Sequence, residues 1–419
     1  MKHFFLIVVT LFVVFSFRAD NADTAMEVTF IKNNFRYADA QLRNMLEDTK
    51  GLRGAFPRTI NKKGKLVTTN MYDWTPGFFP GSLWYGYEYT KDTVLKNAAI
   101  RWTEQLEPLK NFTQHHDLGF MMYCSYGNAY HLTKNKKYKD ILLRSARSLS
   151  TRFNPAAGSI KSWNVFASWH GDRKYYFPVI IDNMMNLELL FFASQVSGDT
   201  SFRHIAVSHA LNTMKNQIRE DYSSYHVVCY DSITGKVLAR ETAQGYADNS
   251  TWSRGQAWGI YGFTMCYRET KDERFLKTAQ GMADYFIHNR NLPGDKIPYW
   301  DFNVDENGYT PGINSNTRNV SVKYRDASAA AIAASALLEL STYSNSRREE
   351  YRNAAVQMLH SLASTRYRAP EHSNGNFLLM HSVGSIPHNT EIDVPLVYAD
   401  YYFLEALQRY DVLLKKGKL

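Results

Sequence analysis

The sequence predicts an all-α fold, an α/α toroid in which two concentric layers of helices are built from six helical hairpins. Three observations predict it. A pattern of apolar helix, short polar turn and second helix recurs along the chain. The helices before the turns are the more apolar, and those after them are amphipathic with a charged face. Apolar helices are buried and amphipathic helices face water on one side, so their alternation indicates an inner and an outer layer.

Five polar turns join the expected helix pairs, and an aromatic or apolar residue begins the second helix after each. The turns are Thr90-Lys91-Asp92, Thr133-Lys134-Asn135, Ser197-Gly198-Asp199, Thr270-Lys271-Asp272 and Tyr343-Ser344-Asn345. Their spacing is irregular, which excludes a strict tetratricopeptide repeat and indicates hairpins joined by long, variable loops.

The expected helices follow these turns along the chain. The more apolar examples are residues 120–130, 184–193, 255–267 and 327–340, and the amphipathic examples are residues 137–149 and 274–288. With an early helix over residues 35–48 and a last one over residues 395–414, about twelve helices result. They make six hairpins and one domain without a linker.

The first residues resemble an export signal. A short basic start precedes the apolar run from Phe4 to Phe17, which suits a signal-peptide core and is short for a membrane span. We expect residues 1–19 to form a signal peptide, although no cleavage site stands out, and residues 20–419 to form one catalytic domain. The protein is then exported to the periplasm, without stable membrane insertion after cleavage. An uncleaved anchor is the alternative.

Composition narrows the class of partner. The formal net charge of +9 favours anionic partners, but no Lys/Arg-dense arm or recognition motif indicates nucleic acid. Several aromatic residues lie beside Gly, Pro and Asp in expected loops, where flat rings suit sugar faces. Cys124, Cys229 and Cys266 match neither a disulfide framework nor a zinc motif, so we expect three small buried apolar side chains.

The loops that lead into the inner helices carry the candidate site. In a toroid all inner helices point the same way, so their first turns converge on one rim, with unpaired N–H groups and positive dipole ends. Such a rim can hold an anionic substrate. The junctions are residues 73–81, 115–120, 180–186, 251–258 and 324–328.

Two carboxylates stand out at this rim, Asp117 and Asp182. An Asp at a helix start is a common N-cap, worth about 1 kcal/mol, and this is the preferred interpretation for Asp326. Asp182 lies between apolar residues, a setting that suits a general acid, and Asp117 supplies a second carboxylate at the same rim. We therefore expect this pair to carry chemistry.

Other polar residues at the rim favour sugar binding over metal chemistry. His115 and His116 are adjacent and do not face one way, so we expect no metal site and no cofactor. Arg254 lies between two tryptophans and suggests a fork for a carboxylate or phosphate, flanked by stacking surfaces. A buried structural salt bridge is the alternative for Arg254.

Three motifs at these junctions, a fourth just before one of them and a fifth near the C-terminus resemble those of a known family. They are residues 116–120, 181–186, 244–248, 252–259 and 383–407. Together they look like glycoside hydrolase family 88, the unsaturated glucuronyl hydrolases, over essentially all of the mature chain in order. The block from Trp252 to Trp258 is the most specific part.

The resemblance implies a six-hairpin α/α toroid, in agreement with the helix pattern. It also implies an anionic substrate, an oligosaccharide whose non-reducing end is a 4,5-unsaturated uronic acid left by polysaccharide lyases. In the implied reaction a proton goes to carbon 4, water adds at carbon 5, and the hemiketal opens to release the neighbouring sugar. One carboxylate serves as acid and base, unlike the carboxylate pair of ordinary glycosidases.

The resemblance also implies roles for residues of this chain. Asp182 matches the general acid/base, and Asp117 matches its partner, which contacts ring hydroxyls and influences the charge state of Asp182. Arg254 with Trp258 matches the group that meets the uronate. The residues that match substrate contacts are His116, His226, Gln244, Arg254, Trp258 and Trp74.

One segment departs from the family pattern. Some relatives that prefer sulfated glycosaminoglycans carry a Ser-x-x-Ser-x-Lys segment near the C-terminus. The comparable stretch here, residues 385–390, keeps Ser385 but has His388 and Thr390 in place of the second serine and the lysine. This departure argues against a preference for a 6-sulfated chondroitin unit. His388 could still meet an anion, so heparin-type, hyaluronan-type and unsulfated substrates stay open.

Two other functions stay open beside the unsaturated glucuronyl hydrolase. One is the related unsaturated rhamnogalacturonyl hydrolase, which applies the same chemistry to pectin fragments. The other is a non-catalytic sugar-binding protein, which would need the tryptophans and Arg254 but tolerate loss of either aspartate. The paired contexts of Asp117 and Asp182 favour the glucuronyl hydrolase. The sequence does not show the leaving-side sugar, the linkage or the oligomeric state.

Overall fold

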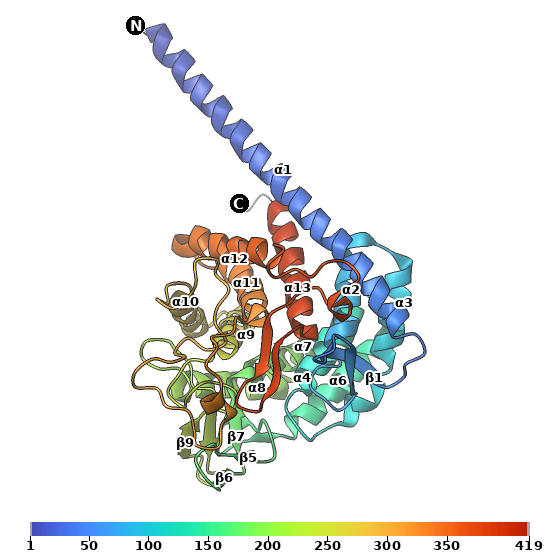
Figure 1. Cartoon of the computed structure of the whole chain (residues 1–419), viewed down its shortest axis with the longest axis vertical. Coiled ribbons are helices and arrows are strands. Elements are labelled where there is room, and N and C mark those ends of the chain that lie inside the picture. Colours follow the sequence, from blue (N-terminus) through green and yellow to red (C-terminus); the bar gives the residue numbers. More distant parts are fainter. Residues whose placement is uncertain (1, 417–419) are drawn as a thin grey trace.

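Inner and outer helices alternate along the chain (Figure 1). The computed structural model describes residues 2–416, with side chains from Thr24 onward. In this part the inner helices are α2 (Phe78–Thr90), the run α4 (Leu118–Met122), η2 (Tyr123–Gly127) and α5 (Asn128–Thr133), α7 (Leu187–Ser197), α9 (Ser253–Thr270), α11 (Ala327–Ser341) and α13 (Val397–Lys415). The outer helices are α1 (Lys2–Asp48), α3 (Thr93–Glu104), α6 (Lys136–Ser150), α8 (Thr200–Asn216), α10 (Glu273–Ile287) and α12 (Arg348–Leu362).

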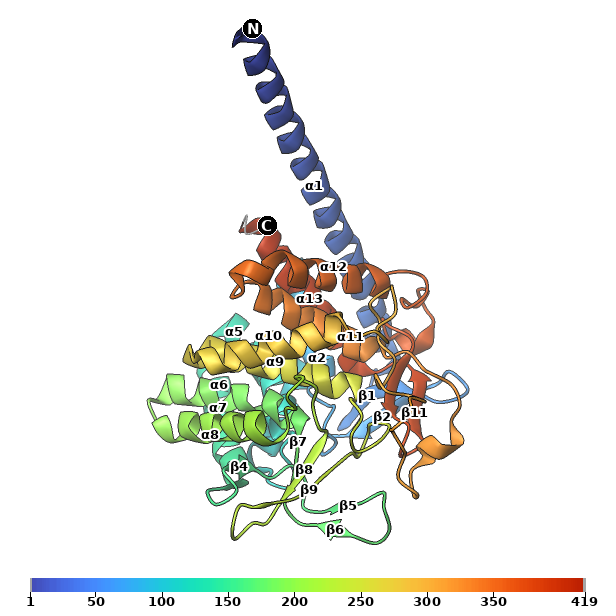
Figure 2. The same cartoon turned by 90° about the vertical axis from the view of Figure 1, so that its left-hand side faces the viewer.

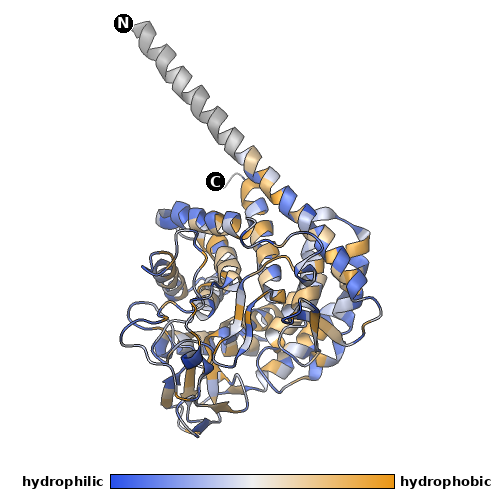
Figure 3. Cartoon of the chain, in the orientation of Figure 1, coloured by the Kyte–Doolittle hydropathy of each residue, from blue (hydrophilic) through white to orange (hydrophobic). Residues whose placement is uncertain are grey.

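Burial separates the two layers as the apolar pattern predicts. Every residue of α11 except Glu339 is buried, and the first fourteen residues of α9 are buried. The outer helices α6 and α10 bury one face only, and hydrophilic residues dominate α12 in Figure 3. The predicted α/α toroid is therefore confirmed, and its helices other than α1 agree with the expected ones within a few residues.

Four of the five polar turns share one structure. In each, the middle residue has a positive φ and ends the first helix, and the following Asp or Asn caps the second helix. The Thr or Ser before them accepts a hydrogen bond from the backbone N–H of that Asp or Asn. Three residues thus contain both the C-cap of the first helix and the N-cap of the second, so the chain reverses direction within a short turn.

The cap of α6 offers a test of this turn. Asn135 Oδ1 accepts from the backbone N–H of Lys137 at 3.0 Å, so Asn135→Ala should lower the free energy of unfolding by about 1 kcal/mol. Asn135→Asp keeps the acceptor and should change it by a few tenths at most. Urea unfolding measures both, with the exposed Asp140→Ala on the same helix as a control. Equal stability of the Asn135→Ala and wild-type proteins would show that the cap is dispensable.

The loops before the inner helices contain small antiparallel sheets that the sequence pattern did not predict. The sheets are β1 (Ala55–Ile60) with β2 (Leu66–Asn70), β3 (Phe153–Asn154) with β4 (Ser159–Ile160), β5 (Phe166–Ala167) with β6 (Lys174–Tyr175), β7 (Pro178–Ile180) with β8 (Val227–Tyr230) and β9 (Val237–Glu241), and β10 (Ser382–Ser385) with β11 (Thr390–Val394). Figure 2 shows β5, β6, β8 and β9 at the bottom of the view and β1, β2 and β11 at its right-hand side. Strands of two to six residues are too short to give an alternating pattern that stands out from loops.

The N-terminal helix α1 is longer than the expected helix over residues 35–48 and projects beyond the two layers (Figures 1 and 2). The predicted signal peptide, residues 1–19, lies outside the residues whose side chains are described. Among the described residues, no helix combines the length and apolar character needed to cross a membrane. The three cysteines are free and buried, as predicted.

Candidate active site

The two carboxylates lie at the starts of inner helices without acting as caps. Asp117 precedes α4 but its side chain makes no capping hydrogen bond, and Asp182 lies in the 3-10 helix η3 (Ile181–Asn186) that leads into α7. By contrast, Asp326 caps α11 by accepting from the backbone N–H of Ser328 at 3.0 Å, as predicted. Asp117 and Asp182 are each 8% exposed, so both are buried carboxylates free of a helix-capping role.

Two histidines hold Asp117. Nδ1 of His115 lies 3.1 Å from Asp117 Oδ2, and Nε2 of His116 lies 3.3 Å from Asp117 Oδ1. Burial alone would raise the pKa of Asp117, but the neighbouring His116 and His115 outweigh burial and hold this pKa below its usual value. The lowered pKa favours the ionised form of Asp117, which has a histidine beside each oxygen.

The contacts of His115 favour its charged form. Its Nε2 lies 3.0 Å from the carbonyl oxygen of Tyr72, and its Nδ1 faces Asp117. Both ring nitrogens face acceptors, and only the imidazolium carries a hydrogen on each of them. Burial opposes a charged ring, but the contacts with Asp117 and Tyr72 outweigh burial and raise the pKa of His115. His115 is a residue of this site to which the sequence assigned no role.

The His115–Asp117 pair gives stability a defined pH dependence. The raised pKa of His115 contributes stability fully below about pH 6.5, the unfolded value, and the contribution is lost as the pH rises through the folded pKa. The lowered pKa of Asp117 contributes fully above about pH 4 and is lost as the pH falls through its folded pKa. The pair therefore stabilises the fold most between about pH 4 and pH 6.5.

We expect His115→Gln to destabilise the protein most in that window, with a deficit that shrinks toward about pH 9. Urea unfolding of the variant and the wild type over a pH series measures the difference. His204→Gln, at an exposed position on α8, serves as the control and should show no such trend. A deficit that stays constant from about pH 5 to pH 9 would contradict a charged His115.

Asp182 has a free oxygen beside His226. Asp182 Oδ2 is buried and has no hydrogen-bond partner within the described residues, and His226 Nε2 lies 3.6 Å from it. His226 Nδ1 accepts from the backbone N–H groups of Ala243 and Gln244, each at 3.1 Å. The ring hydrogen must therefore lie on Nε2, which faces Asp182 across a gap slightly too long for a hydrogen bond. Both atoms therefore lack a hydrogen-bond partner within the described residues.

His116 links the two carboxylates. Burial lowers the pKa of His116, and the charges of both Asp117 and Asp182 oppose that shift. The ring is completely buried, and it interacts electrostatically with both carboxylates. The structure thus brings together Asp117, Asp182 and His116, which lie on two separate junctions of the sequence.

Arg254 forms a buried ion pair, which is the alternative predicted for it from the sequence. Its Nη1 lies 3.0 Å from Asp326 Oδ2, and it also donates to the carbonyl of Val383. Nη2 donates to the carbonyl of Gly384 at 2.7 Å, and the guanidinium lies 4.4 Å from the ring of Trp252. The side chain is 1% exposed, yet it forms part of a cavity wall.

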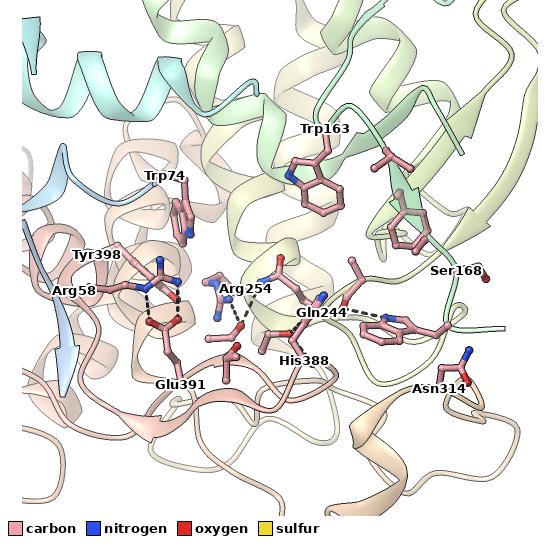
Figure 4. A pocket seen from close by; sticks show the side chains of 18 of the residues that line it. Arg58, Trp74, Trp163, Ser168, Gln244, Arg254, Asn314, His388, Glu391 and Tyr398 are labelled. Atoms are coloured by element: carbon pink, nitrogen blue, oxygen red, sulfur yellow. Dashed lines mark hydrogen bonds and ion pairs between the residues drawn. The ribbon is translucent and has the colours of Figure 1, made fainter. Parts of the chain in front are cut away.

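A cavity of about 670 Å³ opens beside these groups. Figure 4 shows Trp74 and Trp163 above Arg254 and Gln244, with Arg58 and Glu391 toward one end and Asn314 toward the other. Aromatic faces and convergent polar groups in one cavity suit a sugar. Its lining residues are Arg58, Trp74, Trp163, Val165, Phe166, Ala167, Ser168, Trp169, Gly171, Ala243, Gln244, Arg254, Asn314, Gly384, Ser385, His388, Thr390, Glu391 and Tyr398.

The remaining predicted site residues divide between cavity and core. Trp74 and Gln244 line the cavity, and Gln244 Nε2 donates to the carbonyl of Gly384 at 3.2 Å. Trp258 is completely buried between Phe120 and Tyr402, with ring centroids 5.2 Å from each. Its ring therefore packs in the core, and substrate contact by Trp258 stays a prediction.

Several wall residues were not singled out in the sequence. Trp163 and Trp169 come from the loop between β4 and β6, and only the general excess of loop aromatics signalled them. Arg58 pairs with Glu391 at 2.5 Å and with Asp73, three residues that no local motif connects. Within the described part, no group of three or more His, Cys, Asp or Glu side chains is placed to hold a metal ion.

Comparisons with known proteins agree with this geometry. A family model described as Glycosyl Hydrolase Family 88 matches residues 52–412. The chain is 46% identical over 363 residues to an unsaturated glucuronyl hydrolase of Formosa agariphila, a match that covers 86% of each chain.

Solved structures show the same likeness. The structure of an unsaturated glucuronyl hydrolase specific for heparin has a TM-score of 0.84 and 44% identity, and the match covers 93% of this chain and 98% of that one. A variant of the enzyme from Streptococcus agalactiae, complexed with dGlcA-GalNAc6S, has a TM-score of 0.72 and 31% identity, with 91% of each chain covered.

Proposed function

Because the chain belongs to glycoside hydrolase family 88, it is a glycoside hydrolase, and we propose that it hydrates the 4,5-unsaturated uronic acid of lyase-generated oligosaccharides. The observation that carries the proposal is the unequal pair of carboxylates. Asp117 has a histidine nitrogen within 3.3 Å of each oxygen, whereas Asp182 Oδ2 lies 3.6 Å from His226 and has no hydrogen-bond partner within the described residues. One carboxylate is thus available for proton transfer and the other is fixed.

In the proposed reaction Asp182 performs both proton transfers. Its carboxyl group gives a proton to carbon 4 of the unsaturated ring, and the resulting carboxylate takes a proton from the water that adds at carbon 5. The hemiketal at carbon 5 then opens and releases the neighbouring sugar. A residue that is first acid and then base ends each turnover in its starting state, so no second catalytic carboxylate is required.

His226 and Asp117 support this cycle in different ways. The Nε2–H of His226 faces Asp182 at 3.6 Å and has no hydrogen-bond partner within the described residues, so it can donate to a substrate oxygen that contacts Asp182. Asp117 is fixed as an acceptor, which suits it to receive hydrogen bonds from ring hydroxyls. The predicted substrate contacts of His116, His226, Gln244, Arg254, Trp258 and Trp74 belong to this proposal.

The comparisons support this substrate class over the two alternatives. The matched relatives are named unsaturated glucuronyl hydrolases, and one structure contains dGlcA-GalNAc6S. That naming favours a glycosaminoglycan-type disaccharide over a pectin fragment. A buried carboxylate oxygen without a partner costs stability, and a protein that only binds sugar has no need of one.

Residues 385–390, which depart from the family pattern, supply no positively charged side chain that could recognise a sulfate group. Ser385, His388 and Thr390 all line the cavity, and Ser385 Oγ lies 2.7 Å from His388 Nδ1. Burial lowers the pKa of His388, so this ring is neutral near pH 7. We therefore propose that unsulfated or heparin-type and hyaluronan-type units are accepted better than a 6-sulfated chondroitin unit.

Turnover of unsaturated disaccharides tests the proposal. Purified protein should abolish the enoate absorbance of lyase-generated disaccharides, and in heavy water it should place deuterium at carbon 4. A panel from chondroitin, hyaluronan, heparin, alginate, gellan and rhamnogalacturonan then ranks the leaving sugars. Tight binding of an unsaturated disaccharide without turnover would instead establish the non-catalytic alternative.

We also propose that residues 1–19 direct export to the periplasm and that residues 20–419 form one catalytic domain. The apolar run from Phe4 to Phe17 supports export, and the continuous helical core supports a single domain. N-terminal sequencing of protein recovered from the periplasmic fraction tests both. An intact Met1 in a membrane fraction would support the uncleaved anchor.

A further inference from the structure

Asn186 lies at the end of η3 and joins the two catalytic junctions. It is completely buried, and it follows Asp182 by one turn of the chain. Its side chain faces the segment that carries Asp117, because Gly119 allows a close approach: a Cβ at Gly119 would lie 2.5 Å from Asn186 Cα. Because Asn186 is 0% exposed, it cannot touch a substrate, and any effect on the reaction must act through another residue.

The orientation of the Asn186 amide is determined by one backbone donor. The N–H of Phe120 donates to Asn186 Oδ1 at 2.8 Å. A backbone N–H can only donate, so the atom facing it must be the carbonyl oxygen. The amide NH₂ group therefore points the other way, where it lies 3.3 Å from His116 Nδ1.

This orientation selects one tautomer of His116. An amide NH₂ group has hydrogens and no acceptor, so His116 Nδ1 must be the acceptor and carries no hydrogen. The hydrogen of the neutral ring then lies on Nε2, which is 3.3 Å from Asp117 Oδ1. Two hydrogen bonds thus follow one another, from Phe120 N–H to Asn186 and from Asn186 to His116, and they leave the Nε2 hydrogen of His116 facing Asp117.

We infer that Asn186 is a positioning residue that holds His116 as its neutral Nε2–H tautomer and so aims that hydrogen at Asp117. The inference rests on the proposed function, in which Asp117 orients the sugar beside Asp182. In the opposite tautomer a lone pair of His116 would face the carboxylate of Asp117. The lone pair and the carboxylate would then repel each other, and Asp117 would lose one of its two favourable histidine contacts.

The test is the near-isosteric variant N186D. Its first carboxylate oxygen can still accept from the Phe120 N–H, but the second replaces a donor with an acceptor. His116 Nδ1 must then bind a hydrogen, which reverses the tautomer or charges the ring. We expect kcat to fall on the order of 100-fold with little change in KM, since the bound geometry and charge at Asp117 change while the cavity does not.

Nitrogen NMR of ring-labelled histidine reports which ring nitrogen of His116 is protonated. A purely structural role of Asn186 would not change this result. In the wild type, the His116 Nδ1 resonance should be that of an unprotonated nitrogen and the Nε2 resonance that of a protonated one, from about pH 5 to pH 8. His116→Gln assigns the signals by their loss. In N186D the Nδ1 signal should move to the protonated position.

The control is N128D on α5, where Asn128 donates to the carbonyl of Cys124 at 2.9 Å and to Tyr401. It loses a comparable amide donor without touching His116 and should keep wild-type kcat and histidine signals. A folded N186D with kcat within about threefold of wild type would overturn the inference, as would a wild-type His116 protonated on Nδ1. If the wild type turned over no substrate, only the proposed function would fail, and the nitrogen signals alone would decide on Asn186.

Discussion

The Asp182→Asn variant is expected to lose kcat on the order of 10³-fold while keeping the wild-type fold. An amide can neither give a proton to carbon 4 nor take one from water, so both proton transfers are lost. The free energy of unfolding should change little, because Asp182 Oδ2 makes no hydrogen bond within the described residues. Steady-state loss of enoate absorbance, with thermal melting of the same samples, measures both quantities.

The matched control for this prediction is Asp172→Asn. Asp172 is exposed and adjoins Gly171 at the cavity wall, so its loss tests whether any carboxylate near the cavity matters. Asp172→Asn should keep full activity. If folded Asp182→Asn retained activity within about threefold of the wild type, the assignment of Asp182 as acid and base would be wrong.

Replacing Arg254 with methionine is expected to lower the free energy of unfolding by about 3 to 5 kcal/mol. Arg254 and Asp326 are 1% and 0% exposed, so the variant leaves a buried carboxylate without its cation. The carbonyls of Val383 and Gly384 lose their donors as well. Urea unfolding measures the loss.

Two further variants identify the cause of this loss of stability. Arg254→Met combined with Asp326→Leu removes both charges and should recover much of the stability, because a buried pair replaced by apolar residues is often neutral. Arg290→Met, at an ion pair whose arginine is 82% exposed, should have little effect. A stable single variant would show that Asp326 does not depend on Arg254. If the stable double variant also kept a wild-type KM, Arg254 would have no part in binding the uronate.

The helical architecture could be predicted because its signals are local. Apolar and amphipathic periodicity extends over ten or more residues, and each polar turn holds its C-cap and N-cap within three residues, as Thr270, Lys271 and Asp272 do. Asp117 and Asp182 could be found for the same reason, since each lies at the start of an apolar segment. The short strands escaped prediction because two to six residues carry too little pattern.

The sequence alone determined the toroid, the rim that carries the site and the two aspartates. Only the tertiary structure decided how these side chains are paired. It placed Arg254 on Asp326, Arg58 on Glu391, 333 residues away, and His226 beside Asp182. The physical reason is range: helix periodicity and caps arise between residues a few positions apart, whereas partners, tautomers and cavity walls arise where distant segments pack together.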